Sequence, residues 1–142
     1  MRGGAWTHKS YRPLSVLSFA LQFKLLGPEL FRPQPLRAFN VALHAANSLL
    51  VLALLHHGLG FSRRWSRLAA CLFAAHPVHV ENIVYLVGRA DTLATTGMLL
   101  AGLAHLLVRK SWQSGTRTPF VAYAMLLLLT SFLAVLAALC KE

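Results

Sequence analysis

Three short polar clusters interrupt an otherwise apolar chain, and each holds side chains suited to phosphate or acid–base chemistry. The first cluster, residues 8–13, reads His-Lys-Ser-Tyr-Arg-Pro. A guanidinium offers a planar fork of donors that matches phosphate oxygens, and an ammonium adds a point charge. Lys9, Tyr11 and Arg12 are therefore candidate substrate-binding residues. The alternative is a solvated basic segment with no ligand.

The second cluster, residues 76–81, reads His-Pro-Val-His-Val-Glu. Imidazole and carboxylate both bind zinc, but a helix after Pro77 would place His79 and Glu81 about 200° apart. We therefore predict no metal site. A half-buried carboxylate often has a raised pKa that suits acid–base catalysis, so Glu81 is a candidate catalytic residue. His76 and His79 are candidates for substrate binding, and the alternative is a polar helix end.

The third cluster, Gly-Arg-Ala-Asp, precedes a long apolar run. Arg89 could neutralise a phosphate while Asp91 fixes its geometry, which makes Asp91 the second candidate catalytic residue. The alternatives are that Asp91 caps the following helix and that Arg89 pairs with it or extends to lipid headgroups.

The composition indicates a membrane protein with one domain. Of 142 residues, 56% are hydrophobic and 13% are charged, and the formal net charge is +10. An ordinary soluble domain is about 25% charged, and a disordered chain is much less apolar. The cations lie between long apolar runs, so we expect lipid or phosphate groups as partners and no nucleic acid.

The apolar runs predict an all-α, polytopic membrane helix bundle, because a spanning helix needs about 20 mainly apolar residues. Pro77 interrupts one run, since proline lacks an N–H and disfavours helix before it. His44 and Asn47 lie on the same helix face as Asn40, where such residues usually form interhelical hydrogen bonds. The expected spans are at about 38–57, 62–75, 92–108 and 119–140, with a short edge helix at 78–87.

Residues 1–37 are expected to form a loop outside these spans. Within it, leucines at positions 14, 17, 21 and 25 recur every three or four residues, which predicts an amphipathic helix over about 14–26. Such a helix can lie in the membrane interface. All three polar clusters fall on one predicted side of the bundle. Lys and Arg are split almost evenly between the two sides, but the two short Arg-rich loops favour the cytoplasm.

The order of these motifs resembles the transmembrane and tetratricopeptide-repeat-containing O-mannosyltransferases. The motifs are residues 8–14, Asn40 to His44, and residues 76–81, 88–91 and 140–142. The resemblance implies a multi-pass endoplasmic reticulum enzyme with a glycosyltransferase C-type membrane fold. It also implies a donor, dolichyl phosphate mannose, acceptors that are Ser or Thr of luminal cadherin-type proteins, no cofactor, and tetratricopeptide repeats beyond this chain.

On this resemblance the polar clusters would face the lumen. Lys9, Arg12 and Arg89 would neutralise the donor phosphate, and Glu81 and Asp91 would orient acceptor or donor. The family has an upstream span and an acidic pair expected to supply the main catalytic base, and it has arginine where Ala20 stands here. We therefore expect a fragment that is inactive alone. A transporter or channel segment using intramembrane His and Glu, or a non-catalytic anchor, remains an alternative.

Overall fold

The computed structural model describes residues 13–28 and 32–114, together with positions 124–125, 128–129, 131–132 and 135. Every regular element among them is helical, which confirms the all-α prediction. Most of the expected span at 119–140 lies outside the described residues. The helices are α1 (Pro13–Leu26), α2 (Pro33–Ala53), α3 (Arg63–Ala75), α4 (His79–Val84) and α5 (Arg89–Gln113), with a π turn at Leu54–Gly58 and a 3₁₀ turn at Leu86–Gly88.

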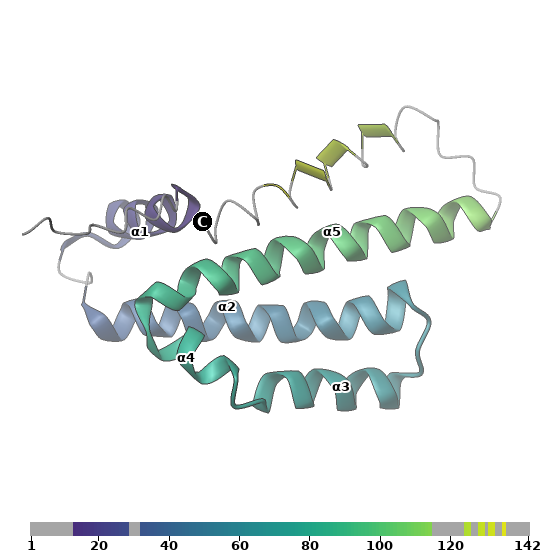
Figure 1. Cartoon of the computed structure of the whole chain (residues 1–142), viewed down its shortest axis with the longest axis horizontal. Helices are drawn as coiled ribbons and strands as arrows, with labels where there is room; N and C mark the ends of the chain where they lie inside the picture. Colours follow the sequence, from purple (N-terminus) through teal and green to yellow (C-terminus); the bar gives the residue numbers. More distant parts are fainter. Residues whose placement is uncertain are drawn as a thin grey trace, which may run out of the picture.

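The central helix is α2, which packs against both α3 and α5 (Figure 1). It begins at Pro33, five positions before the expected span. A proline is tolerated there because the N–H groups of a first helical turn have no partner within the helix. After the π turn, Gly60 adopts a positive φ of 77° that lets the chain turn back into α3.

Most of the buried side chains among the described residues are polar, and many large apolar side chains are exposed. The face of α2 that packs inward carries Asn40, His44, Asn47 and Ser48, all buried. Large apolar side chains such as Leu49 and Met98 are exposed instead. A water-soluble bundle has the opposite distribution, so this surface suits lipid.

Among the described residues, two helices are long and apolar enough to cross a membrane. Residues Pro33–Gly58 form one, which is 26 residues long and contains an 18-residue stretch with a mean hydropathy of 1.8. Residues Leu86–Gln113 form the other, which is 28 residues long and contains an 18-residue stretch with a mean hydropathy of 1.4. Both extend beyond the expected spans at 38–57 and 92–108.

Interhelical hydrogen bonds hold the polar face of α2. The amide of Asn47 donates through Nδ2 to the carbonyl of Thr92 at 3.0 Å and accepts at Oδ1 from the Thr96 hydroxyl at 2.8 Å. On the other side, His44 Nε2 donates to the carbonyl of Ala74 at 3.2 Å. The prediction that His44 and Asn47 bond across helices is therefore confirmed.

Three elements differ from the sequence-based expectations. The expected crossing at 62–75 is α3, whose 13 residues extend only about 20 Å, against a hydrocarbon core of about 30 Å. The edge helix ends at Val84 and is followed by the 3₁₀ turn. Helix α1 is present as expected, but its exposed apolar residues are not confined to one face, and its buried side chains are polar: Ser15 and Gln22.

We expect Gly88→Ala to destabilise the bundle. A Cβ at this position would overlap the backbone of Asn82, so α4 and the 3₁₀ turn would have to separate. The expected loss in the free energy of unfolding is about 1–3 kcal/mol, measured by denaturant titration in detergent micelles. The control is Gly102→Ala, because a Cβ there would meet only Leu54 Cδ1 at an ordinary 3.6 Å. Equal stability of the two variants would contradict this close contact.

Candidate functional site

One end of the bundle gathers the polar residues that the sequence singled out. Helix α4, the 3₁₀ turn and the start of α5 lie beside the N-terminal half of α2 (Figure 1). Glu81 on α4 is exposed, and Asp91 in the first turn of α5 is half-buried. Lys9, Tyr11 and Arg12 lie outside the described residues, so their role as substrate ligands stays a prediction.

Arg89 is the most enclosed charged side chain among the described residues. It is 0% exposed. Its Nε donates to Asn40 Oδ1 at 2.9 Å, and its Nη2 donates to the carbonyl of Leu36 at 3.1 Å. The guanidinium carbon lies 3.9 Å from the ring centroid of Phe19 and 4.7 Å from that of Phe39. The guanidinium therefore joins α1, α2 and α5, with two aromatic faces to stabilise its charge.

The surroundings of Arg89 leave some hydrogen-bonding capacity unused. Within the described part of the chain no carboxylate contacts it, and both its Nη1 and the Nδ2 of Asn40 are buried without a hydrogen-bond partner. Helix α1 lies over this group, held by Phe19 and by a bond of 3.4 Å from Gln22 Nε2 to the carbonyl of Pro35. Phosphate binding by Arg89 stays a prediction, and it would require α1 to move.

Of the two histidines in the second cluster, His79 packs with His44 and Phe73, and His76 packs with His79. The ring centroids of His44 and His79 are 4.8 Å apart, those of Phe73 and His79 are 4.4 Å apart, and those of His76 and His79 are 6.1 Å apart. Burial lowers the pKa of His79, and the neighbouring His44 and His76 lower it further. Among the described residues no three His, Cys, Asp or Glu side chains are placed to share a metal ion.

His76 and Asp91 have local structural roles. The Nδ1 of His76 accepts a hydrogen bond of 3.2 Å from the N–H of Val78, which stabilises the turn after Pro77. Asp91 is not the N-cap of α5, because Gly88 holds that position. Its carboxylate lies in the first turn, where the helix dipole favours negative charge. Glu81 therefore remains the candidate catalytic group most open to a substrate.

A double-mutant cycle should detect the bond between Arg89 and Asn40. Asn40→Leu alone leaves a buried charged donor without its acceptor and should cost about 2–4 kcal/mol of unfolding free energy. Adding Arg89→Met removes that donor, so the double variant should be more stable than the sum of the two single changes by at least about 1 kcal/mol. The measurement is denaturant titration in micelles, with the exposed Arg64→Met as control. Strict additivity would contradict the coupling.

Acidification should destabilise the fold through the cluster formed by His44, His76 and His79. The pKa of His79 is lowered in the folded protein from its ordinary 6.5, so the unfolded chain binds a proton more readily. The free energy of unfolding should therefore be constant at pH values above 6.5. It should fall as the pH decreases below 6.5, until His79 of the folded protein also binds the proton. His79→Phe keeps an aromatic ring and should flatten the dependence, whereas the exposed His105→Gln should not. An unchanged slope in His79→Phe would exclude His79 as the cause.

Comparison with known proteins finds relatives in the family that the order of the sequence motifs resembles. The chain is 36% identical to protein O-mannosyl-transferase TMTC4 of Homo sapiens over 148 residues, which cover 96% of this chain and 19% of that protein. It is 40% identical to TMTC1 of Mus musculus over 136 residues and 37% identical to Tmtc2 of Drosophila melanogaster over 137 residues, covering 96% of this chain and 14% of each relative.

No family model and no solved structure matches the chain. The relatives nevertheless come from vertebrates and an insect and agree along almost its whole length. The chain is therefore homologous to a part of the TMTC protein O-mannosyl-transferases, spanning less than one fifth of the length of these relatives.

Proposed function

We propose that this chain forms part of the membrane domain of a protein O-mannosyl-transferase of glycosyltransferase C-type fold. The transferase would use dolichyl phosphate mannose to modify Ser or Thr of luminal proteins, cadherins among them, at the endoplasmic reticulum membrane. Its tetratricopeptide repeats would lie in another part of the protein. The observation that carries the proposal is homology to the TMTC enzymes over 96% of the chain.

The inverted distribution of polarity supports this proposal. A dolichyl chain stays in lipid while its phosphate lies near the membrane surface, so the enzyme needs an apolar exterior and a polar end. The described bundle has both, since many large apolar side chains are exposed on it and Glu81, Asp91, His76 and His79 gather at one end. The expected spans at 38–57, 92–108 and 119–140 are part of this proposal, with the polar end luminal. Helix α3, at 13 residues, would cross the membrane only together with α4.

We assign different tasks to the polar residues. Lys9, Tyr11 and Arg12 precede α1 in the sequence and would bind the donor phosphate, whose leaving negative charge needs cations. Glu81, exposed on α4, would orient the acceptor hydroxyl or accept its proton. Arg89 would act as a positioning residue, because its contact with Phe19 fixes α1 and thereby limits where the preceding basic cluster can reach.

A chimaera tests the role of Glu81. The homologous segment of human TMTC4 is replaced by this chain, and mannosyl transfer from dolichyl phosphate mannose to a cadherin domain is measured in membranes. We expect the chimaera to be active and Glu81→Gln to lower its turnover by more than about tenfold, because the amide cannot accept a proton.

The matched control is Glu81→Asp, which keeps the carboxylate and should retain more activity than the amide variant. Membrane insertion of both variants should equal that of the parent chimaera, since Glu81 is exposed. Full turnover with Glu81→Gln would assign this carboxylate a structural role. An inactive but correctly inserted parent chimaera would count against the proposed function itself.

A further inference from the structure

The opposite end of the bundle holds a basic pocket that the proposed transfer reaction does not use. It lies between the last turns of α2 and the start of α3 and encloses about 350 Å³. Its apolar wall consists of Leu49, Leu52 and Ala53. Its basic wall consists of four side chains: His56, His57, Arg63 and Arg67.

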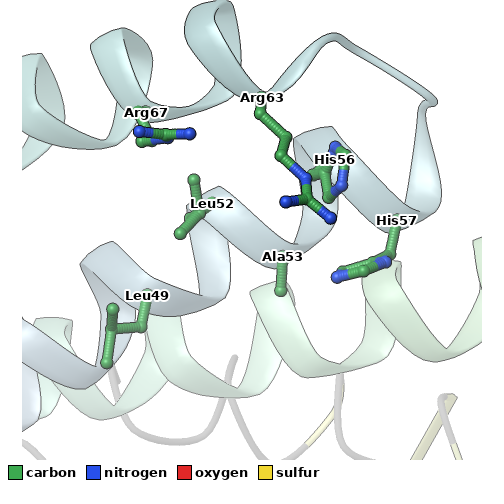
Figure 2. Close-up of a pocket in the computed structure, with 7 residues that line it drawn as sticks. All are labelled: Leu49, Leu52, Ala53, His56, His57, Arg63 and Arg67. Atoms are coloured by element: carbon green, nitrogen blue, oxygen red, sulfur yellow. The ribbon is translucent and has the colours of Figure 1, made fainter.

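Both arginines line the pocket and lie one turn apart on α3. Figure 2 shows the guanidinium of Arg63 extending toward α2 and lying near His56, whereas that of Arg67 lies closer to α3. His56 is held in place because its Nδ1 donates to the carbonyl of Phe61 at 3.0 Å. The ring centroids of His56 and His57 are 4.7 Å apart. These contacts fix part of the basic wall before any ligand binds.

No acidic residue balances this charge nearby. The sequence has no Asp or Glu between residues 30 and 80 or between residues 92 and 141. A second hollow of about 350 Å³ at the same end is also basic, lined by Arg109 and Lys110 beside Gly58 and Gly60. In the described part of the chain, this end of the bundle therefore presents cations without carboxylates to neutralise them.

The level of the pocket along α2 bears on the class of anion that it can bind. Helical residues Pro33–Gly58 number 26, which corresponds to about 39 Å of helix, more than the 30 Å or so of hydrocarbon. The last turn, with His56 and His57, therefore falls at the level of lipid headgroups. Leu49, 66% exposed, lies two turns further into the hydrocarbon.

We propose that this pocket binds an acidic glycerophospholipid. Arg63 and Arg67 donate to its phosphate through guanidinium forks, and one acyl chain lies along Leu49 and Leu52. A soluble phosphate would use only the basic wall and would leave the exposed leucines without a partner. A zwitterionic lipid would bring its own ammonium group against the two arginines. An acidic lipid can place its phosphate against the basic wall and an acyl chain against the apolar wall.

The experiment uses native mass spectrometry of the whole chain in detergent. Phosphatidylinositol and phosphatidylcholine with identical acyl chains are added separately, and the occupancy of each is measured. We expect phosphatidylinositol to remain bound and phosphatidylcholine not to. Arg63→Gln with Arg67→Gln should weaken phosphatidylinositol binding by about tenfold or more, because two charge-assisted bonds are lost. Arg64→Gln is the matched control, since this exposed arginine on the same helix does not line the pocket.

Each outcome decides the proposal. Equal retention of both lipids, or an equal effect of Arg64→Gln, would overturn it by showing unspecific adsorption. Displacement of the lipid by inorganic phosphate at millimolar concentration would show a phosphate site without an acyl component. Leu52→Asn should weaken lipid binding while leaving the arginines intact, which tests the apolar wall separately. If the double arginine variant unfolds, each single variant is measured against Arg64→Gln in the same way.

Discussion

The described bundle depends on a buried arginine that no carboxylate neutralises. Arg89 is held by Asn40, by a backbone carbonyl and by two phenylalanine rings from α1 and α2. In water such burial would be costly, because the guanidinium loses its hydration. Two hydrogen bonds and two aromatic faces offset part of this cost. Because these partners come from α1 and α2 while Arg89 belongs to α5, the three helices must meet around this charge.

The need to bond polar groups inside the bundle also explains the polar stripe along α2, which consists of Asn40, His44, Asn47 and Ser48. Lipid tails give no hydrophobic drive for helices to associate, so hydrogen bonds and close packing must do so. Asn47 bonds to α5 through both ends of its amide, and His44 bonds to α3. Asn40 continues the stripe to Arg89. One face of a single helix thus organises its neighbours on both sides, while its other face exposes apolar side chains such as Val41 and Leu49.

Local sequence patterns were enough to predict the helices, the inward-facing stripe of α2 and the break at Pro77. They did not reveal the position of Arg89, because the Gly-Arg-Ala-Asp sequence is typical of an exposed helix start. Its partners Phe19 and Asn40 come from distant segments. The proximity of His79 to His44 was missed for the same reason. The local patterns also did not reveal that the expected span at 62–75 contains a helix of only 13 residues.

The two ends of the bundle also bear on its orientation in the membrane. Counting Lys and Arg along the sequence gave nearly equal totals for the two sides, but such a count treats Arg89 as a loop charge. Arg89 is buried and bonded within the bundle, so it does not act like an exposed loop cation. At the opposite end, Arg63, Arg64 and Arg67 are exposed at the very start of α3, and Arg109 and Lys110 are exposed near the end of α5. Cations in short loops close to membrane helices are the ones that favour the cytoplasmic side. The proposed cytoplasmic position of the basic end agrees with this rule, and it would place Glu81 and Asp91 on the luminal side where the proposed acceptors are.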